Sequence, residues 1–253
     1  MMLFTQTTFI GIDPTAGNRP ITYAALNRDL KLLALGTGDL DTVAAFVGGQ
    51  QSAFVAVNGP PRPNQGLMKQ PQIRESLHPA PRPGRWKGFR VAEYLLSQRG
   101  IRTPRTPANP ENCPAWMRRG FDIYKRLAEL DYQPYPVEET PRQWLEVYPH
   151  ASFTILLGCQ PFPKSTFEGR VQRQLLLYNQ GVKIPDPMRV FEEITRYRLL
   201  HGILPLNDLH TQSELDALMA AFAAWVAATS PQASTLLGHP DEGQIVLPAP
   251  LAL

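Results

Sequence analysis

TFIGIDPTAG, residues Thr8 to Gly17, is the stretch of sequence that decides the fold. Its uncharged run up to Ile12 is typical of a buried strand, and the Pro-Thr-Ala-Gly sequence after Asp13 is typical of a turn made of small residues. The strand therefore ends in a carboxylate with open space beside it. Because ligand sites of α/β proteins lie at the carboxyl ends of strands, Asp13 is the first candidate functional residue.

Two further apolar segments follow this strand. Ile21–Asn27 (ITYAALN) and Lys31–Gly36 (KLLALG) each have the length and composition of a strand, and Arg28-Asp29 connects them. We therefore predict a meander of three antiparallel strands.

A helix and a fourth strand come next. Asp39 or Asp41 can cap a short helix that ends at a pair of glycines, and Ala53–Asn58 (AFVAVN) is typical of a buried strand. A helical crossover returns the chain in the same direction. We therefore expect the fourth strand to lie parallel to the first, with Asn58 beside Asp13.

A charged residue interrupts the fifth predicted strand. Gln143–Tyr148 (QWLEVY) is otherwise free of charge but carries Glu146. Burying a carboxylate is costly unless it is paired or bound to a metal, so Glu146 is the second candidate. An ion pair with Arg142 or Arg173 is the structural alternative.

Apolar residues at helical spacing predict the remaining helices. The predicted segments are Phe89–Gln98, Ala115–Leu130, Lys164–Asn179, Met188–His201 and Glu214–Ala228, and residues 238–250 predict a turn and a short edge strand. In the last helix Asp216 lies on a side lined by Ala220 and Ala223, whose small size would let the helix approach the sheet and bring Asp216 to the strand ends. Ser213-Glu-Leu-Asp216 also fits a capping box, which is the structural alternative for Asp216.

The segment from Gly59 to Pro114 is rich in proline and in positive charge. Gly59–Arg119 contains twelve Lys/Arg and three acids, a net charge of +9, whereas the rest of the chain carries −6. We predict an irregular insertion over about 59–114. Segregated positive charge favours a polyanion as partner, and the interspersed aromatic residues are suited to stacking on bases; a solvated basic loop is the alternative.

Length and composition set the other bounds. The 253 residues with 43% hydrophobic content predict one domain over residues 1–253 that includes the insertion. The longest apolar run is about half a membrane span, and the first residues lack the basic segment of a signal peptide, so no membrane association and a cytoplasmic location are expected. Cys113 and Cys159 show neither metal-ligand nor disulfide spacing.

Three carboxylates thus come from separate elements that can meet at one edge of the sheet: Asp13, Glu146 and Asp216. Such a hard oxygen site suits Mg²⁺ or Mn²⁺, and Asn58 can add a carbonyl oxygen. Two such ions would activate a water and stabilise the leaving oxygen of a phosphodiester. His150, just after the fifth strand, can orient water or phosphate, with a purely structural role as its alternative.

Seven blocks of the chain, in order, resemble one family. They are GIDPTAG, VAVNGPPRP, RVAEYLLSQRGI, EVYPHASF, KSTFEGRVQRQLLL, SELDALMAAFAAW and DEGQIVLP. They are similar to the domain of unknown function 429 family, whose members are described as predicted RNase H-like nucleases. The resemblance implies an RNase H-like α/β fold, in which a mixed five-stranded sheet of an antiparallel meander plus parallel strands is flanked by helices.

The resemblance also implies roles for residues. Asp13, Glu146 and Asp216 fall on the active-site acids of the family. Lys164, Arg170 and Arg173 fall on a basic helix that could face phosphates. Together with Arg90 of the insertion and His150, which the resemblance does not assign, they are the candidate nucleic-acid contacts. One block departs from the family pattern, because Ile-Asp-Ala-Pro is replaced by Val57-Asn58-Gly59-Pro60. Asn58 supplies no charge, so metal affinity is expected to fall.

Three functions remain open at this point. The first is a Mg²⁺- or Mn²⁺-dependent nuclease acting on a nucleic acid of unspecified type. The second is a non-catalytic nucleic-acid-binding protein that retains the fold with a degraded set of acids. The third is an actin-like or sugar-kinase-like phosphotransferase, because Gly-Ile-Asp followed by Thr15 and Gly17 resembles a phosphate loop, although the chain is short for two lobes. The oligomeric state, a homodimer included, is left open.

Overall fold

The computed structural model describes residues 7–15, 19–138 and 140–249. Its sheet contains eight strands in the order β3-β2-β1-β4-β6-β8-β7, with β5 pairing β6 off this path. The strands are β1 (Thr8–Asp13), β2 (Ile21–Leu26), β3 (Leu32–Gly38), β4 (Ala53–Asn58), β5 (Gln133–Pro134), β6 (Arg142–Val147), β7 (Thr235–His239) and β8 (Gly243–Leu247). The small residues Ala16 and Gly17 of the predicted first turn lie outside the described residues.

The first four strands confirm the predicted topology. β1 pairs with β2 and β2 with β3 in antiparallel fashion, and β1 pairs with β4 in parallel. Ile12 lies opposite Val57 in the parallel pair, so β1 and β4 end at the same edge of the sheet. Every residue of β1 is buried, as its uncharged sequence predicted.

The prediction of five strands is wrong, because the described part of the sheet has eight. The C-terminal segment forms a hairpin of β7 and β8 instead of a single edge strand, and β8 pairs in parallel with β6. Glu146 lies opposite Ile245 in that pair. Because the pairing of β6 with β8 joins segments far apart in the chain, no local pattern could reveal it.

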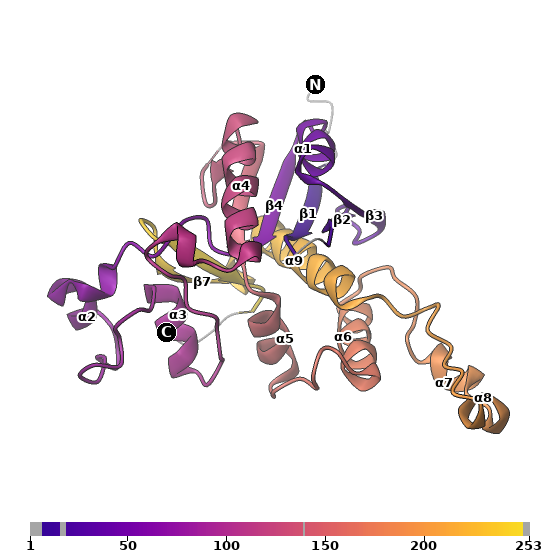
Figure 1. Cartoon of the computed structure of the whole chain (residues 1–253). Coiled ribbons are helices and arrows are strands. Elements are labelled where there is room, and N and C mark those ends of the chain that lie inside the picture. The colour runs from indigo at the N-terminus through magenta and orange to yellow at the C-terminus, as the bar shows by residue number, and fades with distance from the viewer. Residues whose placement is uncertain (1–6, 16–18, 139, 250–253) are drawn as a thin grey trace.

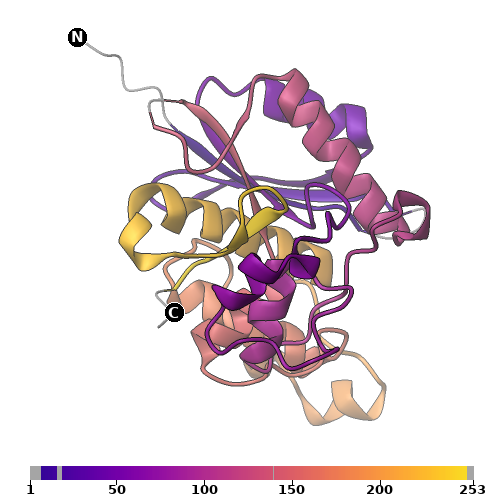
Figure 2. The ribbon, with the colours of Figure 1, turned by 90° about the vertical axis from the view of Figure 1, so that its left-hand side faces the viewer.

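Helices cover both faces of the sheet (Figure 1). They are α1 (Leu40–Gly48), α2 (Pro71–Glu75), α3 (Val91–Gln98), α4 (Ala115–Glu129), α5 (Pro149–Leu157), α6 (Phe167–Asn179), α7 (Arg189–Glu193), α8 (Arg196–Leu200) and α9 (Gln212–Thr229). Short 3₁₀ helices lie at Leu67–Lys69, Pro110–Asn112 and Pro231–Ala233. Figure 2 shows α1 and α4 on one face and α9 on the other, and each layer has its own apolar cluster. No helix among the described residues is long and apolar enough to cross a membrane.

Close packing between α9 and β1 positions the candidate site. A Cβ atom at Gly11 would lie 2.0 Å from the carbonyl oxygen of Ala217 and 2.3 Å from the amide nitrogen of Ala221. The backbones therefore touch where both elements carry small residues. This contact brings the first turns of α9 to the carboxyl end of β1.

The predicted helix Met188–His201 is wrong, because the segment forms two short helices, α7 and α8. Ile194 takes an extended conformation, and the hydroxyl of Thr195 accepts a hydrogen bond from the amide of Arg198 to cap a new helix. The two helices project from the rest of the molecule (Figure 1). Residues 188–201 do have helical spacing, but the cap at Thr195 divides the segment into two helices.

Candidate active site

Asp13 and Asn58 lie side by side at the ends of β1 and β4, as the topology predicted. The side-chain amide of Asn58 donates a hydrogen bond of 3.1 Å to a carboxylate oxygen of Asp13. Ser213, at the start of α9, also favours the charged form of Asp13 through its side chain. Asp13 is 8% exposed, so this carboxylate is largely withdrawn from water.

Asp216 comes to the same place from α9. The helix is capped by Thr211 and Glu214, which form the capping box. Ser213 therefore does not cap the helix, and Asp216 lies in its second turn with 5% of its surface exposed. Lys164 Nζ donates to Asp216 Oδ2 over 3.0 Å. The capping role considered for Asp216 is thus excluded.

The charge of Asp216 affects the protonation of Asp13. Burial, and next the charge of Asp216, raise the pKa of Asp13 from 3.8 to about 6, against the opposing effects of Ser213, Lys164 and Asn58. The charge of Asp216 raises the pKa of Lys164, so this ammonium stays protonated. The pair of acids is therefore only partly neutralised by Lys164, and a further cation would stabilise it.

A cavity of about 780 Å³ opens over these residues. In the described part of the chain, the acidic residues that line this cavity are Asp13 and Asp216. Its basic, polar and aromatic wall residues include Arg19, Arg102, Trp116, Tyr148, His150, Lys164 and Arg173. Burial and the charge of Arg173 lower the pKa of His150, so the imidazole is neutral at pH 7. Two acids set among several cations are suited to holding a phosphate group.

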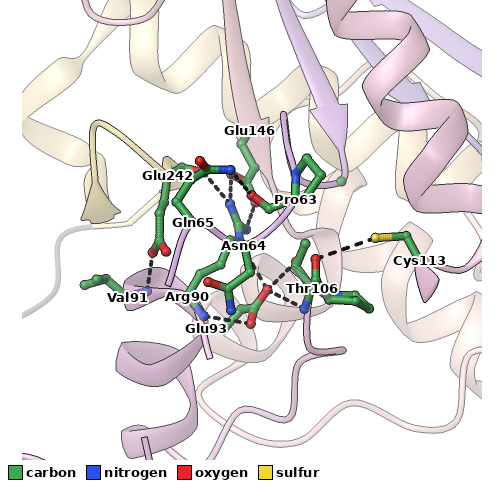
Figure 3. Close-up of polar contacts among 12 residues, drawn as sticks. Pro63, Asn64, Gln65, Arg90, Val91, Glu93, Thr106, Cys113, Glu146 and Glu242 are labelled. Atoms are coloured by element: carbon green, nitrogen blue, oxygen red, sulfur yellow. Dashed lines mark hydrogen bonds and ion pairs between the residues drawn. The ribbon is translucent and has the colours of Figure 1, made fainter. Parts of the chain in front are cut away.

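Glu146 does not reach this cavity. It is 3% exposed and forms a buried ion pair with Arg90, whose Nη1 donates to Glu146 Oε2 over 2.9 Å. A second, shorter bond joins Arg90 Nη2 to Glu146 Oε1. Figure 3 shows Arg90 between Glu146 and Glu93, beside Glu242 of the β7–β8 turn. The expectation that three carboxylates converge is therefore corrected, because the third acid binds an arginine of the insertion.

Arg90 itself is 1% exposed. Burial by itself would lower the pKa of Arg90, but the charges and hydrogen bonds of Glu146 and Glu93 outweigh it and raise that pKa. The guanidinium is held charged inside the protein and cannot reach a nucleic acid from there. Its predicted contact with nucleic acid is thus corrected to a structural role.

The other predicted basic contacts divide into two groups. Lys164, Arg173 and His150 line the cavity. Arg173 is fixed there because it donates to the carbonyl oxygens of Phe162 and Gly169 over 2.9 and 2.8 Å. Arg170 instead donates to the carbonyl oxygens of Leu209 and His210 and is not part of the cavity wall. In the described ranges, no group of three or more His, Cys, Asp or Glu residues could hold a metal ion.

The sequence did not identify Ser213, Tyr148 or Arg19 as site residues. Ser213 precedes Asp216 by one helical turn, so a shared helix face was the available signal. Tyr148 directly follows β6, and burial together with Asp216 raises its pKa to about 12. α5, which begins at Pro149 and carries His150 into the cavity wall, was also missed.

Asp13 gives a prediction for stability against pH. Because folding raises its pKa from 3.8 to about 6, the folded state binds this proton more tightly than the unfolded chain does. The contribution of Asp13 to the free energy of unfolding is therefore complete below pH 3.8 and is lost as the pH rises through 6. Asp13→Asn stays neutral, so at pH 8 it is expected to be more stable than the wild type by about 1–3 kcal/mol, and the difference should approach zero near pH 4.

Urea denaturation in EDTA at several pH values measures this difference. Asp41→Asn is the control, because Asp41 is exposed on α1 and its ion pair with Arg126 is worth at most about 1 kcal/mol. A variant Asp13→Asn that is less stable than the wild type at pH 8 would contradict this prediction, because it would mean that the fold stabilises the charged form of Asp13.

The fold and site define a mixed α/β protein with two buried carboxylates at the edge of its sheet, facing a cavity rich in cations. The chain belongs to the family described as proteins of unknown function (DUF429), whose model matches residues 51–242. This match includes Asn58, Lys164 and Asp216. No curated protein and no solved structure gives a significant match to the chain.

Proposed function

We propose that this protein is a divalent-metal-dependent nuclease of RNase H-like fold, which hydrolyses phosphodiester bonds of a nucleic acid. The observation that carries the proposal is the pairing of Asp13 with Asp216 inside a cavity whose other charged wall residues are cations. The order of an antiparallel meander followed by the parallel strands β1, β4 and β6 supports the fold assignment.

The donor set fits a hard divalent cation. Asp13, whose pKa is raised by burial and by the charge of Asp216, would be stabilised in its charged form by a nearby cation, and Mg²⁺ is commonly held by one or two carboxylates plus the phosphates of its substrate. Asn58 turns its amide nitrogen toward Asp13, so it orients the carboxylate and is not itself a ligand in this arrangement. When bound between Asp13 and Asp216, the ion would supply Lewis acidity for activating water and for stabilising the leaving oxygen.

The chain's own residues bind and orient the phosphodiester. Lys164 has 55% of its side chain exposed, so its ammonium can leave Asp216 for a phosphate oxygen without moving the backbone. Arg173 is fixed by two backbone carbonyls and adds positive potential at the cavity wall. His150 is neutral, and one of its ring nitrogens lies 3.3 Å from the side chain of Gln160. Because an amide nitrogen can only donate, Nε2 of His150 accepts from Gln160 and Nδ1 carries the proton, which it can donate to a water or a phosphate oxygen.

Hydrolysis assays test the proposal. The protein is incubated with Mg²⁺ or Mn²⁺ and with single-stranded, duplex, hybrid and branched substrates. Activity is expected on at least one of them, and Asp13→Asn and Asp216→Asn should each reduce it to the level of a blank, whereas Asp41→Asn should retain it. Mn²⁺ should also raise the Tm of the wild type and of Asp41→Asn but not of the two site variants. Activity that persists unchanged in both site variants would identify a contaminant.

A non-catalytic nucleic-acid-binding protein is the second candidate. The ion pair between Lys164 and Asp216 favours it, because the ammonium already neutralises one carboxylate without a metal ion. Asn58 also stands where the family pattern has an acid. Binding that weakens with salt, without turnover and without a Mn²⁺ effect on Tm, would select this candidate.

A further inference from the structure

A second cavity, of about 760 Å³, lies entirely within the insertion. Four exposed cations line it, Arg82, Arg85, Lys87 and Arg105. No acidic residue contributes to its described wall, and none of the four takes part in an ion pair within the described parts of the chain. Like charges that converge without acidic partners favour an anion as occupant.

Arginine stacking in this region favours phosphates over bases as the groups recognised. The guanidinium of Arg105 lies 4.3 Å from the centre of the Phe89 ring, and that of Arg74 lies 4.3 Å from the centre of the Trp86 ring. Each contact covers one aromatic face that a base would need. Of the two arginines, Arg105 lines the cavity, and its stacking leaves the edge N–H groups able to match phosphate oxygens. Arg74 lies outside the cavity wall and donates to the carbonyl oxygen of Met68.

A short segment connects this cavity to the candidate active site. Arg102 and Pro104 line the first cavity, and Arg105 lines the second. Three residues of chain span at most about 10 Å between Arg102 and Arg105. A small phosphate compound could fill only one of the two cavities, whereas a polynucleotide carries regularly spaced phosphates that reach both.

We propose that the insertion cavity is a second phosphate-binding site, which holds the backbone of a polynucleotide while another phosphate of the same strand occupies the cavity at Asp13 and Asp216. This inference rests on the proposed function for the identity of the first site. It makes the substrate a strand of several nucleotides that is bound without base readout, and not a mononucleotide.

Binding of fluorescein-labelled 20-nucleotide RNA and DNA strands, followed by fluorescence anisotropy in EDTA, tests the inference. The cavity variant is Arg82→Gln/Arg85→Gln/Lys87→Gln. Its matched control is Lys183→Gln/Arg189→Gln/Arg196→Gln, which removes the same charge from exposed positions outside both cavities. At about 0.1 M salt the cavity variant is expected to bind ~10- to 100-fold more weakly than the control, with a salt slope shallower by up to about 2, because each lost phosphate contact contributes about 0.7.

Equal affinities of the two triple variants would overturn the inference. So would micromolar binding of pyrophosphate that is lost in the cavity variant, because the cavity would then belong to a small anion. Strands of different base sequence should bind alike, and a strong base preference that the cavity variant abolishes would also count against it. Binding is measured in EDTA and does not depend on hydrolysis, so a failed nuclease assay would leave the binding result valid. If the protein hydrolyses nucleic acid but the two triple variants bind equally, the second phosphate site is wrong and the proposed function is retained.

Discussion

Gly11→Ala is expected to lower the free energy of unfolding by at least about 3 kcal/mol, and Gly11→Val by more, to the point where little folded protein is recovered. The added Cβ atom would lie 2.0 Å from the carbonyl oxygen of Ala217 and 2.3 Å from the amide nitrogen of Ala221. Both are backbone atoms, so no rotation of a side chain can relieve the overlap. The whole of α9 must move away from β1.

Urea denaturation monitored by circular dichroism measures this loss. Gly49→Ala is the matched control, because a Cβ atom there meets its nearest atom at 3.5 Å and the backbone is in the right-handed helical region. It should change stability by no more than about 0.5 kcal/mol. Similar values for Gly11→Ala and Gly49→Ala would mean that α9 does not lie this close to the sheet.

The same change should reach the candidate site. Asp216 is carried by α9 and Asp13 by β1, so moving the helix separates the two carboxylates. Any folded Gly11→Ala protein should therefore lose the rise in Tm with Mn²⁺ that the proposed function predicts. The close approach of these two elements is what makes one site out of two distant parts of the chain.

Local sequence patterns predicted the part of the site that Asp13 and Asn58 form. The strand ending in Asp13, the crossover helix and the strand ending in Asn58 each have a periodicity or a cap of their own, and a parallel pair then requires their ends to meet. The 3.1 Å hydrogen bond between Asn58 and Asp13 agrees with that deduction.

Asp216 shows where a local pattern leaves two solutions. Thr211-x-x-Glu214 and Ser213-x-x-Asp216 both fit a capping box, and they differ by two residues in where the helix begins. The structure uses Thr211, which leaves Ser213 and Asp216 free to face Asp13. The alanine-rich face of α9 packs on β1, and this long-range contact has no signature at the cap itself.

Glu146 shows the limit of such predictions. A carboxylate in an apolar strand does predict a partner of opposite charge or a metal, but it does not say which. The partner is Arg90, an arginine of the insertion 56 residues earlier in the chain. The candidates considered from sequence, Arg142 and Arg173, make hydrogen bonds to backbone carbonyls instead.

Arg90→Met is the second change with a large expected effect. Arg90 lies in a buried cluster, where its guanidinium donates hydrogen bonds to Glu146, to Glu93 and to the backbone carbonyl of Glu242. Removing one partner of a buried ion pair leaves an uncompensated charge and costs about 3–5 kcal/mol. Because two carboxylates lose their partner here, we expect a loss at the upper end of that range at pH 8.

The cost should depend on pH. Without Arg90 the two buried carboxylates lose the cation that compensates them, so protonation at lower pH becomes a way to remove the buried charge. Arg90→Met should therefore approach the stability of the wild type as the pH falls from about 8 to 5, and adding Glu93→Gln and Glu146→Gln should recover part of the loss at pH 8. Arg126→Met, which breaks exposed ion pairs with Asp41 and Glu129, should cost no more than about 1 kcal/mol at either pH.

The cluster also joins the insertion to the sheet. Arg90 and Glu93 belong to the start of α3, Glu146 to β6, and Glu242 to the turn between β7 and β8, where its carboxylate accepts hydrogen bonds from the amides of Leu67 and Val91. Arg102 and Pro104, which line the candidate active site, follow α3 in the chain. If Arg90→Met costs no more than Arg126→Met, the insertion is held by its apolar contacts alone. If it costs as much as expected, a carboxylate that the family resemblance assigns to catalysis instead holds the insertion against the sheet beside the site.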